Sequence, residues 1–438
     1  MDPVTSGILI AVALMVLMAI GTPIAFALGS VSLGALVLDR GFGELTYFGE
    51  TFYSSLASFG FVAIPMFILM GAAVASSPTG RDLYRSLDLW MGRVPGGLAI
   101  SNIGACAIFA ALSGSSPATS AAIGKLGIPE MRKRGYPDGV AAGSIAAGGT
   151  LGILIPPSVT MIVYGIATET SIGRLFLAGV VPGLMLVGLF MVWSLWSTWR
   201  SGQASVLSAG SYSWRERMEI LPRVLPFVAI IIGVLYAMYG GIATPSETAA
   251  VGALLCLLIA VVIYKLWDPR AIWVILRDST KESVMILFII AAAGVFSYML
   301  SSLFITQAIA EWIGTLDVNR WVLMGTINVF LIIAGFFLPP VAVILMAAPI
   351  LLPIITTAGF DPIWFAVVLT INMEIGLISP PVGLNLYVIN GIAPDISLRT
   401  ILVGSLPFVA CMVVAIVLLC LFPGLATWLP DLIMGAAL

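Results

Sequence analysis

Four short stretches rich in proline, glycine and serine interrupt sequence that is otherwise apolar enough to lie in lipid. Two of them are residues 111–120 (ALSGSSPATS) and 149–158 (GTLGILIPPS). The other two are residues 336–341 (FFLPPV) and 374–382 (EIGLISPPV). Proline inside a helix removes a backbone hydrogen bond and clashes with the preceding turn, so each stretch predicts a helix break. The fold must therefore satisfy freed backbone groups at four places within an apolar body.

The apolar body is too large for a water-soluble protein. Of 438 residues, 60% are hydrophobic and only 9% are charged, whereas soluble domains have about 45–50% apolar and about 25% charged residues. Runs long enough to cross a bilayer recur along the whole chain. The apolar run at residues 4–38 is predicted to form the first membrane segments and not a cleaved signal peptide. The sequence predicts an all-α polytopic membrane protein.

The side-chain inventory excludes several functions. The chain has no histidine, the residue that most often serves as general base, proton shuttle or zinc ligand. Its net charge of −2 argues against nucleic acid as a partner. Residues 148–152 are glycine-rich but lack the P-loop lysine, so ATP is not the predicted energy source. No cofactor is predicted. Four cysteines stand singly in apolar runs, as buried hydrophobic residues do: Cys106, Cys256, Cys411 and Cys420.

Residues 1–199 are predicted to form a first repeat. Within residues 97–134, the break at SGSSP separates two apolar arms that are each shorter than the about 20 residues a crossing requires. Both ends of this segment are basic, with Arg93 on one side and Arg132, Lys133 and Arg134 on the other. The segment is therefore predicted to be a re-entrant hairpin that opens to the cytoplasm. A broken helix is predicted over residues 138–168, and residues 39–58 are predicted to form a polar loop.

Residues 224–438 repeat this order after a basic linker at residues 200–223, which is predicted to be cytoplasmic. Thr22 and Pro23 recur as Thr244 and Pro245, displaced by 222 positions, and the two Pro-Pro pairs are displaced by 224. A second hairpin is predicted at residues 320–357 and a second broken helix at residues 361–390. About five crossings in each repeat is an odd number, so the two repeats are predicted to have inverted topology, with both termini outside.

A broken helix exposes carbonyl groups where its first half ends and N–H groups where its second half begins. Carbonyl and hydroxyl oxygens suit a hard cation such as sodium, and the positive helix starts suit an anion. Ser116-Pro117 and Ser379-Pro380 each place a capping residue before a proline, which is typical of a helix start. A single break would be explained by helix packing. Four breaks arranged in two pairs favour a substrate and ion site in a secondary transporter.

Several polar residues in apolar surroundings are weaker candidates. Glu247 and Glu374 are carboxylates of a kind that often mark function inside membranes, although Glu247 is equally compatible with a place at the outer interface. Asn372 and Asn385 flank the last break and could contact substrate or a neighbouring helix. Two other classes stay open as alternatives. A membrane-embedded enzyme would need a cluster of catalytic side chains that the sequence lacks, and an ion channel would need a continuous pore.

The motifs as a set resemble the large membrane subunit of tripartite ATP-independent periplasmic (TRAP) transporters, the type that takes up C4-dicarboxylates and sialic acid. The resemblance extends over the whole chain. It is carried by IPMF at residues 64–67 with Gly71, SGSSPATSA at 113–121, GILIPPS at 152–158, TPSE at 244–247 and GLISPPVG at 376–383. It implies sodium-coupled uptake of a small organic anion, a carboxylate or sulfonate, across the bacterial inner membrane. The implied mechanism is an elevator, in which a transport domain slides past a scaffold.

The resemblance also implies site residues and partners. Ser379 stands where the family often has threonine, and either hydroxyl can bind sodium. The implied partners are a separate small membrane subunit of four helices, a soluble periplasmic substrate-binding protein, and membrane lipid. Sodium ligands are expected at both breaks: Ser113, Ser115, Ser116, Gly152 and Ile155 at the first, and Gly335, Gly376 and Ser379 at the second.

Substrate contacts are expected from the hairpin tips and the broken helices. The expected residues are Ser116, Thr150, Pro156, Pro340, Pro381 and Asn385. Sodium is the only metal ion expected to bind.

Overall fold

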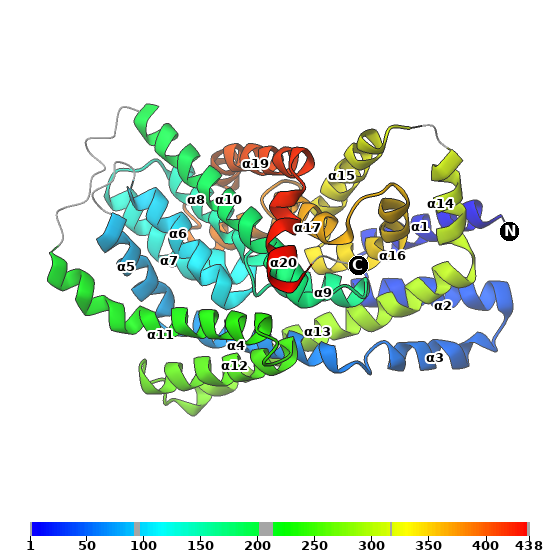
Figure 1. The fold of residues 1–438 in the computed structure, drawn as a ribbon, viewed down its shortest axis with the longest axis horizontal. Coiled ribbons are helices and arrows are strands. Elements are labelled where there is room, and N and C mark those ends of the chain that lie inside the picture. Colours follow the sequence, from blue (N-terminus) through cyan, green and yellow to red (C-terminus); the bar gives the residue numbers. More distant parts are fainter. Residues whose placement is uncertain (1, 92–96, 201–212, 316–317, 436–438) are drawn as a thin grey trace.

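The computed structural model describes residues 2–91, 97–200, 213–315 and 318–435, and every regular element in these ranges is a helix (Figure 1). The prediction of an all-α protein is confirmed. The predicted linker at residues 200–223 lies largely outside the described ranges, as does Arg93 of the first hairpin.

A first set of helices packs together along the lower side of the molecule in Figure 1, and we name it the outer group. In this group, the long helix at residues 269–302 contacts three helices from the first quarter of the chain. The outer group consists of α1 (Pro3–Ala19), α2 (Ile24–Arg40), α3 (Glu44–Ser54), η1 (Phe59–Val62), α4 (Ala63–Ala75), α11 (Trp214–Tyr239), α12 (Pro245–Val262) and α13 (Pro269–Ser302).

The remaining membrane helices form the inner group, which contains all four predicted breaks. It consists of α6 (Gly97–Ser113), α7 (Ser116–Lys133), α8 (Asp138–Thr150), η2 (Leu151–Ile153), α9 (Val159–Ala167), α10 (Ile172–Arg200), α15 (Arg320–Phe337), α16 (Pro340–Thr357), α17 (Pro362–Leu377), α18 (Leu384–Ile392), α19 (Leu398–Leu421) and α20 (Gly424–Met434). Helix α17 lies at its centre, because every residue from Ile363 to Leu377 is buried. The core of the protein is thus built around one of the broken helices.

Two further helices, α5 (Thr79–Met91) and α14 (Ile305–Thr315), follow α4 and α13 and lead into the two helix pairs at the first and second breaks. In the sequence of α5, Arg and Asp alternate with Leu, Tyr and Trp at helical spacing. In the structure α5 packs on α6 and α7 of the inner group and on α11 of the outer group. Asp88 of α5 pairs with Arg134 at 2.9 Å. Asp82 accepts a hydrogen bond from Tyr264 at 3.0 Å. Asp82 and Asp88 of α5 therefore connect the outer group with the inner group.

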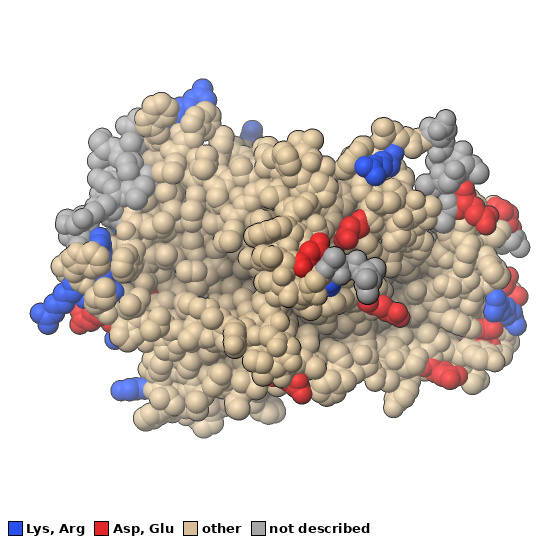
Figure 2. All heavy atoms as spheres, in the orientation of Figure 1, with Lys and Arg blue, Asp and Glu red and all other residues tan. Residues whose placement is uncertain are grey.

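The distribution of charge agrees with a protein that lies in lipid. On the face drawn in Figure 2, Lys and Arg side chains gather mainly around α5 and the start of α11, while Asp and Glu lie mainly toward α14 and α2–α3. Most of the surface between them is uncharged. Apolar side chains of α11 and α12 remain exposed, including Ile232, Leu254 and Leu258. Such a surface is stable in contact with hydrocarbon but not with water.

Seven helices of the described chain are long and apolar enough to cross a membrane, namely α10, α11, α12, α13, α15, α16 and α19. Helices α3 and η1–α4 add an eighth span if this pair, which is bent by 55°, is taken as one. The multi-pass architecture is confirmed. The tally of about ten crossings stays a prediction, because α1, α6 and α17 are apolar but shorter.

Two local expectations differ from the structure. Residues 39–58 were predicted to form a loop, yet most of them form α3. Its sequence, ELTYFGETFYS, puts an acidic residue in the first turn and aromatic residues on one side, which is sufficient for a helix packed on α2 and α13. Part of the predicted linker is also helical, because α11 begins at Trp214 behind a capping box formed by Ser213 and Glu216.

Candidate functional site

The first break separates α6 from α7 at Gly114 and Ser115. Gly114 has a φ of +59°, in the left-handed region that favours glycine. A Cβ atom there would lie 2.9 Å from the carbonyl oxygen of Pro157. Glycine is therefore required at position 114 for two reasons. It turns the chain between the two helices, and it lets the tip of this helix pair approach the broken helix that follows it.

Oxygen atoms are concentrated at this tip. The hydroxyl groups of Ser113 and Thr119 share a hydrogen bond of 2.9 Å. Both hydroxyl oxygens also lie within hydrogen-bond distance of the Ser115 carbonyl oxygen, at 3.3 Å from Ser113 and 2.8 Å from Thr119, so two hydroxyl hydrogens serve these three contacts. Ser113, Ser116 and Thr119 are buried. Such a set of hydroxyl and carbonyl oxygens is the donor chemistry that a hard cation prefers.

The first broken helix approaches this tip closely. It consists of α8, the short helix η2 and, after a break at residues 154–158, α9. A Cβ atom on Gly152 would lie 2.7 Å from the carbonyl carbon and oxygen of Ser115. Ser158 begins α9 by accepting a hydrogen bond from the Met161 N–H at 3.3 Å. Ile155 is half-buried, with its side chain near Gly183 of α10. The break thus brings Gly152 and Ser115 together, whereas the Ile155 side chain is directed elsewhere.

The second break is built mainly from backbone. Helices α15 and α16 meet at Leu338 and Pro339, and α17 and α18 are separated by residues 378–383. A Cβ atom on Gly376 would collide with the carbonyl group of Gly335. The Val382 N–H donates to the carbonyl oxygen of Phe336 at 3.3 Å. Ser379 is 5% exposed. Gly335, Gly376 and Ser379 therefore lie along one contact between the helix pair and the broken helix.

A side chain of the second broken helix connects the two breaks. The Nδ2 group of Asn385 donates to the Ser116 hydroxyl at 2.8 Å and to the Ala146 carbonyl at 3.1 Å. Its Oδ1 atom is buried without a hydrogen-bond partner among the described residues. Asn372 likewise donates to Asn328 and to the Val368 carbonyl, and its Oδ1 atom also has no hydrogen-bond partner among the described residues. Asn385 thus keeps an acceptor free beside the first tip.

A cavity of about 240 Å³ opens between the two tips and the outer group. Of the predicted site residues, Ser113, Ser115, Ser116 and Pro340 line it, whereas Thr150, Pro156, Pro381 and Asn385 do not. Thr150 is fully buried and donates its hydroxyl to the Ala147 carbonyl at 2.7 Å. The outer group contributes Glu282 of α13, which was missed in the sequence. A usable signal existed, because Glu282 is the last charged residue before the apolar part of α13.

The two carboxylates singled out in the sequence have different surroundings. Glu247 completes a capping box at the start of α12, accepting from the Thr244 N–H and hydroxyl at 2.8 Å each. That contact is a structural role. Glu374 on α17 is fully buried, and neither carboxylate oxygen has a hydrogen-bond partner among the described residues. The described residues contain no group of three His, Cys, Asp or Glu residues that could hold a metal ion.

The chain matches the family described as "Tripartite ATP-independent periplasmic transporter, DctM component" over residues 11–425. It belongs to this DctM family. A C4-dicarboxylate TRAP transporter large permease protein of Pseudomonas aeruginosa is 39% identical over 84% of this chain and 86% of that protein. A sialic acid TRAP transporter large permease protein of Vibrio cholerae is 30% identical over 95% of this chain and 96% of its own length. The prediction made from the motifs is confirmed.

The fold of this DctM-family chain is also that of a known transporter. The crystal structure of the Alcanivorax borkumensis YdaH transporter matches it with a TM-score of 0.65 and 15% identity, over 90% of this chain and 91% of that one. The chain is therefore a multi-pass protein of the bacterial inner membrane and a permease component, not an enzyme.

Proposed function

We propose that this DctM-family chain is the membrane permease of a sodium-coupled system for uptake of a small organic anion. The two relatives carry C4-dicarboxylate and sialic acid in their names, and both compounds are organic anions. The observation that carries the proposal is the cavity where the two tips meet, lined by Ser113, Ser115 and Ser116 from one tip and Pro340 from the other. Carbonyl and hydroxyl oxygens lie beside it, and two helices begin at its edge.

The oxygen atoms at each break fit a sodium ion. At the first break we propose Ser113, Ser115, Ser116, Gly152 and Ile155 as ligands, the last two through backbone carbonyls. The close approach of Gly152 to Ser115 supports this set, because it draws the oxygens of two segments together. At the second break we propose Gly335, Gly376 and Ser379. There the contact of Gly376 with Gly335 gives the same support.

The anion would bind between the two tips. Helices α7 and α16 start at Ser116 and Pro340, which both line the cavity. A helix start carries partial positive charge and unpaired N–H groups, so both favour a carboxylate or sulfonate. The free Oδ1 atom of Asn385 lies next to Ser116 and would orient a hydroxyl or protonated group of the substrate. Thr150, Pro156 and Pro381 would shape the site from behind these residues.

An elevator movement of an inverted repeat is part of the proposal. Corresponding helices start at matching positions: α7 and α16 at 116 and 340, a difference of 224, and α9 and α18 at 159 and 384, a difference of 225. A further cavity of about 320 Å³ follows α13 from Ile290 to Ser297, beyond the stretch at the first cavity. Loose packing along one face of α13 supports a boundary at which the inner group slides past the outer group as transport domain and scaffold.

The tripartite description of the family supports two partners. We propose a small four-helix membrane subunit that widens the outer group, and a soluble periplasmic binding protein that delivers the anion. Substrate choice would then depend on both the binding protein and the cavity.

Transport assays in proteoliposomes test the proposal. The chain and both partners, reconstituted with a radiolabelled C4-dicarboxylate, sialic acid or sulfonate, are expected to accumulate the anion above its external concentration only under an inward sodium gradient. Unchanged accumulation with potassium in place of sodium would contradict sodium coupling. Equilibration without accumulation in any gradient would indicate a passive channel instead.

A further inference from the structure

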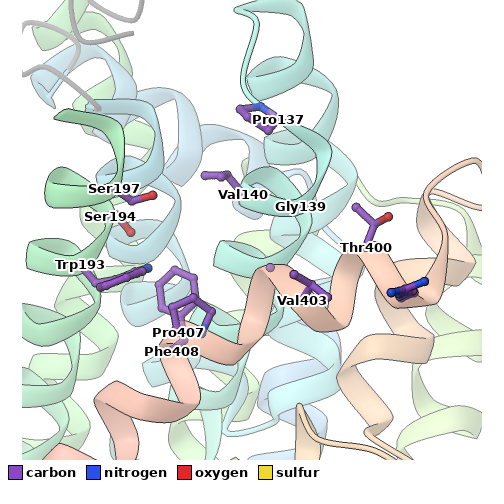
Figure 3. Close-up of a pocket in the computed structure, with 12 residues that line it drawn as sticks. Pro137, Gly139, Val140, Trp193, Ser194, Ser197, Thr400, Val403, Pro407 and Phe408 are labelled. Carbon is purple, nitrogen blue, oxygen red and sulfur yellow. The ribbon is translucent and has the colours of Figure 1, made fainter. Parts of the chain in front are cut away.

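A groove of about 440 Å³ lies between α8, α10 and α19, and none of its lining residues lines the cavity at the breaks. Figure 3 shows side chains of all three helices around the same space. The lower wall in this view comes from α19, with Val403, Pro407 and Phe408, and α10 contributes Trp193. Phe408 is held by an edge-on contact with Phe190 at 5.2 Å between ring centres. The interior of the groove is thus apolar, and the contact between Phe190 and Phe408 fixes one of its walls.

Glycine residues create the floor of this groove. Gly139 of α8 and Gly404 of α19 both line it, and a Cβ atom on Gly404 would collide with the backbone of Gly139. The two helices can therefore cross at backbone contact, with no side chains to fill the space above the crossing. A gap of this kind in a lipid-facing surface must be filled by something apolar, because an empty void loses dispersion contacts on both sides.

The other end of the groove is polar. Ser194, Ser197, Thr400 and Arg399 line it together with Pro137. Ser194 is only 3% exposed, and its hydroxyl has no hydrogen-bond partner within the described part of the chain. A buried hydroxyl in that state destabilises the protein unless an acceptor reaches it. Arg399 is exposed and makes no ion pair with any described residue. The structure thus leaves one donor on the α10 side of the groove and one positive charge on the α19 side, and Figure 3 shows Ser194 and Thr400 on these two sides.

The polar mouth lies where three helix ends meet. Helix α8 begins after Pro137, α10 ends at Arg200 and α19 begins at Leu398. The same end carries Arg132, which pairs with Asp138 at 2.9 Å and with Asp395 at 2.5 Å. The basic residues at 132–134 predict that this end faces the cytoplasm.

We propose that this groove binds one anionic phospholipid of the cytoplasmic leaflet. The phosphate group would pair with Arg399 on the α19 side of the groove. An acyl chain would lie over the Gly139–Gly404 crossing, between Trp193 and Phe408. Basic pockets between membrane helices on the cytoplasmic side commonly hold anionic headgroups. The cavity also has the size of small-molecule sites, about 300–1,000 Å³. The lipid would travel with the inner group, since all three helices belong to it.

Native mass spectrometry of the full-length chain tests this site. Delipidated protein in detergent is titrated with phosphatidylglycerol or phosphatidylcholine, and the first tightly bound lipid is counted. Phosphatidylglycerol is expected to bind about tenfold more tightly, because phosphatidylcholine carries the same phosphate but adds a quaternary ammonium group that Arg399 repels. Arg399→Gln should remove this preference, because it deletes the charge but keeps a polar side chain. Arg270→Gln is the matched control, since Arg270 is an exposed arginine at the start of α13 and does not line the groove.

A second variant tests the apolar part independently of the headgroup. Val403→Trp should fill the groove and prevent binding of the first lipid of either class, while the folded protein keeps its thermal transition. Equal affinity for the two lipids in the unaltered chain would overturn the proposal, as would an unchanged preference in Arg399→Gln. Photocrosslinking from p-benzoylphenylalanine at position 403 in membranes should yield phospholipid. A crosslink to a polypeptide would assign the groove to a protein partner instead. All of these outcomes are independent of sodium coupling.

Discussion

The two breaks have the same order of elements but different chemistry. At the first, the hydroxyls of Ser113 and Thr119 and the carbonyl of Ser115 form a buried polar cluster. At the second, two glycine backbones touch and Ser379 is the main hydroxyl, while Pro339, Pro380 and Pro381 around it are exposed. One break is thus built from side chains and the other from backbone. Mutations should therefore affect them differently, even if both bind the same ion.

The largest effect is expected where backbone meets backbone. Gly376→Ala should abolish sodium-dependent uptake, because its Cβ atom would collide with the Gly335 carbonyl group. Gly335→Ala should be milder, since the nearest atom to its Cβ would be the flexible Met373 Cε at 3.3 Å. Gly391→Ala on α18 is the control, because no atom lies within 4 Å of its Cβ position. Uptake rates and sodium titrations in proteoliposomes measure all three. Equal losses in Gly376→Ala and Gly391→Ala would remove the special role of the glycine contact.

The next largest effect is expected at Glu374, which corresponds in the second broken helix to Thr150 in the first. Glu374 lies 224 positions after Thr150, the displacement that relates the two Pro-Pro pairs. Thr150 satisfies its hydroxyl within its own helix, whereas both oxygens of Glu374 lack partners among the described residues. A buried carboxylate costs far more than a neutral amide of the same shape. Glu374→Gln should therefore raise the melting temperature.

Uptake measurements test whether the buried carboxyl group of Glu374 contributes to transport. If the carboxylate serves transport, Glu374→Gln should be more stable and yet slower in uptake. Thr150→Val is the comparison, since it removes a hydroxyl that is already satisfied and should change uptake much less. A Glu374→Gln protein that is both more stable and fully active would make Glu374 a residue without a transport role.

A smaller difference between the two breaks is expected when a hydroxyl group is removed from each. Ser113→Ala removes the group that Thr119 and Ser115 share, so it should cost about 0.5–1.5 kcal/mol per lost hydrogen bond and weaken sodium binding. Ser379→Ala should weaken sodium dependence too, but with less loss of stability, because the hydrogen bond that Ser379 donates comes from its backbone N–H, to the Gly376 carbonyl at 3.4 Å, and is kept in alanine. Thermal melts with and without sodium separate the two effects. A larger loss of stability in Ser379→Ala than in Ser113→Ala would reverse the comparison.

The sequence predicts local features of this site well because proline, glycine and serine act locally. Pro117, Pro156 and Pro340 mark helix starts or breaks within a few residues of where the structure has them. Contacts over long separations were not predictable. The bond from Asn385 to Ser116 joins residues 269 positions apart, and Glu282 reaches the cavity from another group of helices. Such contacts depend on how whole helices pack, and one apolar sequence is compatible with many packings. Helix α3 was missed for a related reason, since its packing on α13 joins segments far apart in the sequence.

The smallest change in thermal stability is expected from mutations at the C-terminal ends of α7 and α16, the second helices of the two pairs. The end of α7 is held by ion pairs of Arg132 with Asp138 and Asp395. The end of α16 has instead Thr356 and Thr357, whose hydroxyls donate to carbonyls of their own helix. The hydrogen bond from Arg132 holds the pKa of Asp395 below its ordinary value. A carboxyl group with a lowered pKa stabilises the fold above its unfolded pKa, about 3.9, and loses this contribution as the pH falls through the folded value.

Asp395→Asn should therefore lower the melting temperature slightly at neutral pH and converge with the unaltered chain in acid. The difference should be small because both side chains are exposed and solvent screens the pair. High salt should reduce it further. Melting curves from neutral pH to about pH 3 measure the effect, with Thr357→Val as the matched change at the other end. Only the first end should show a difference that depends on pH, because no carboxylate contributes to the hydroxyl contacts of α16. A pH-dependent difference in Thr357→Val as well would mean that acid acts on the whole inner group and not through this ion pair.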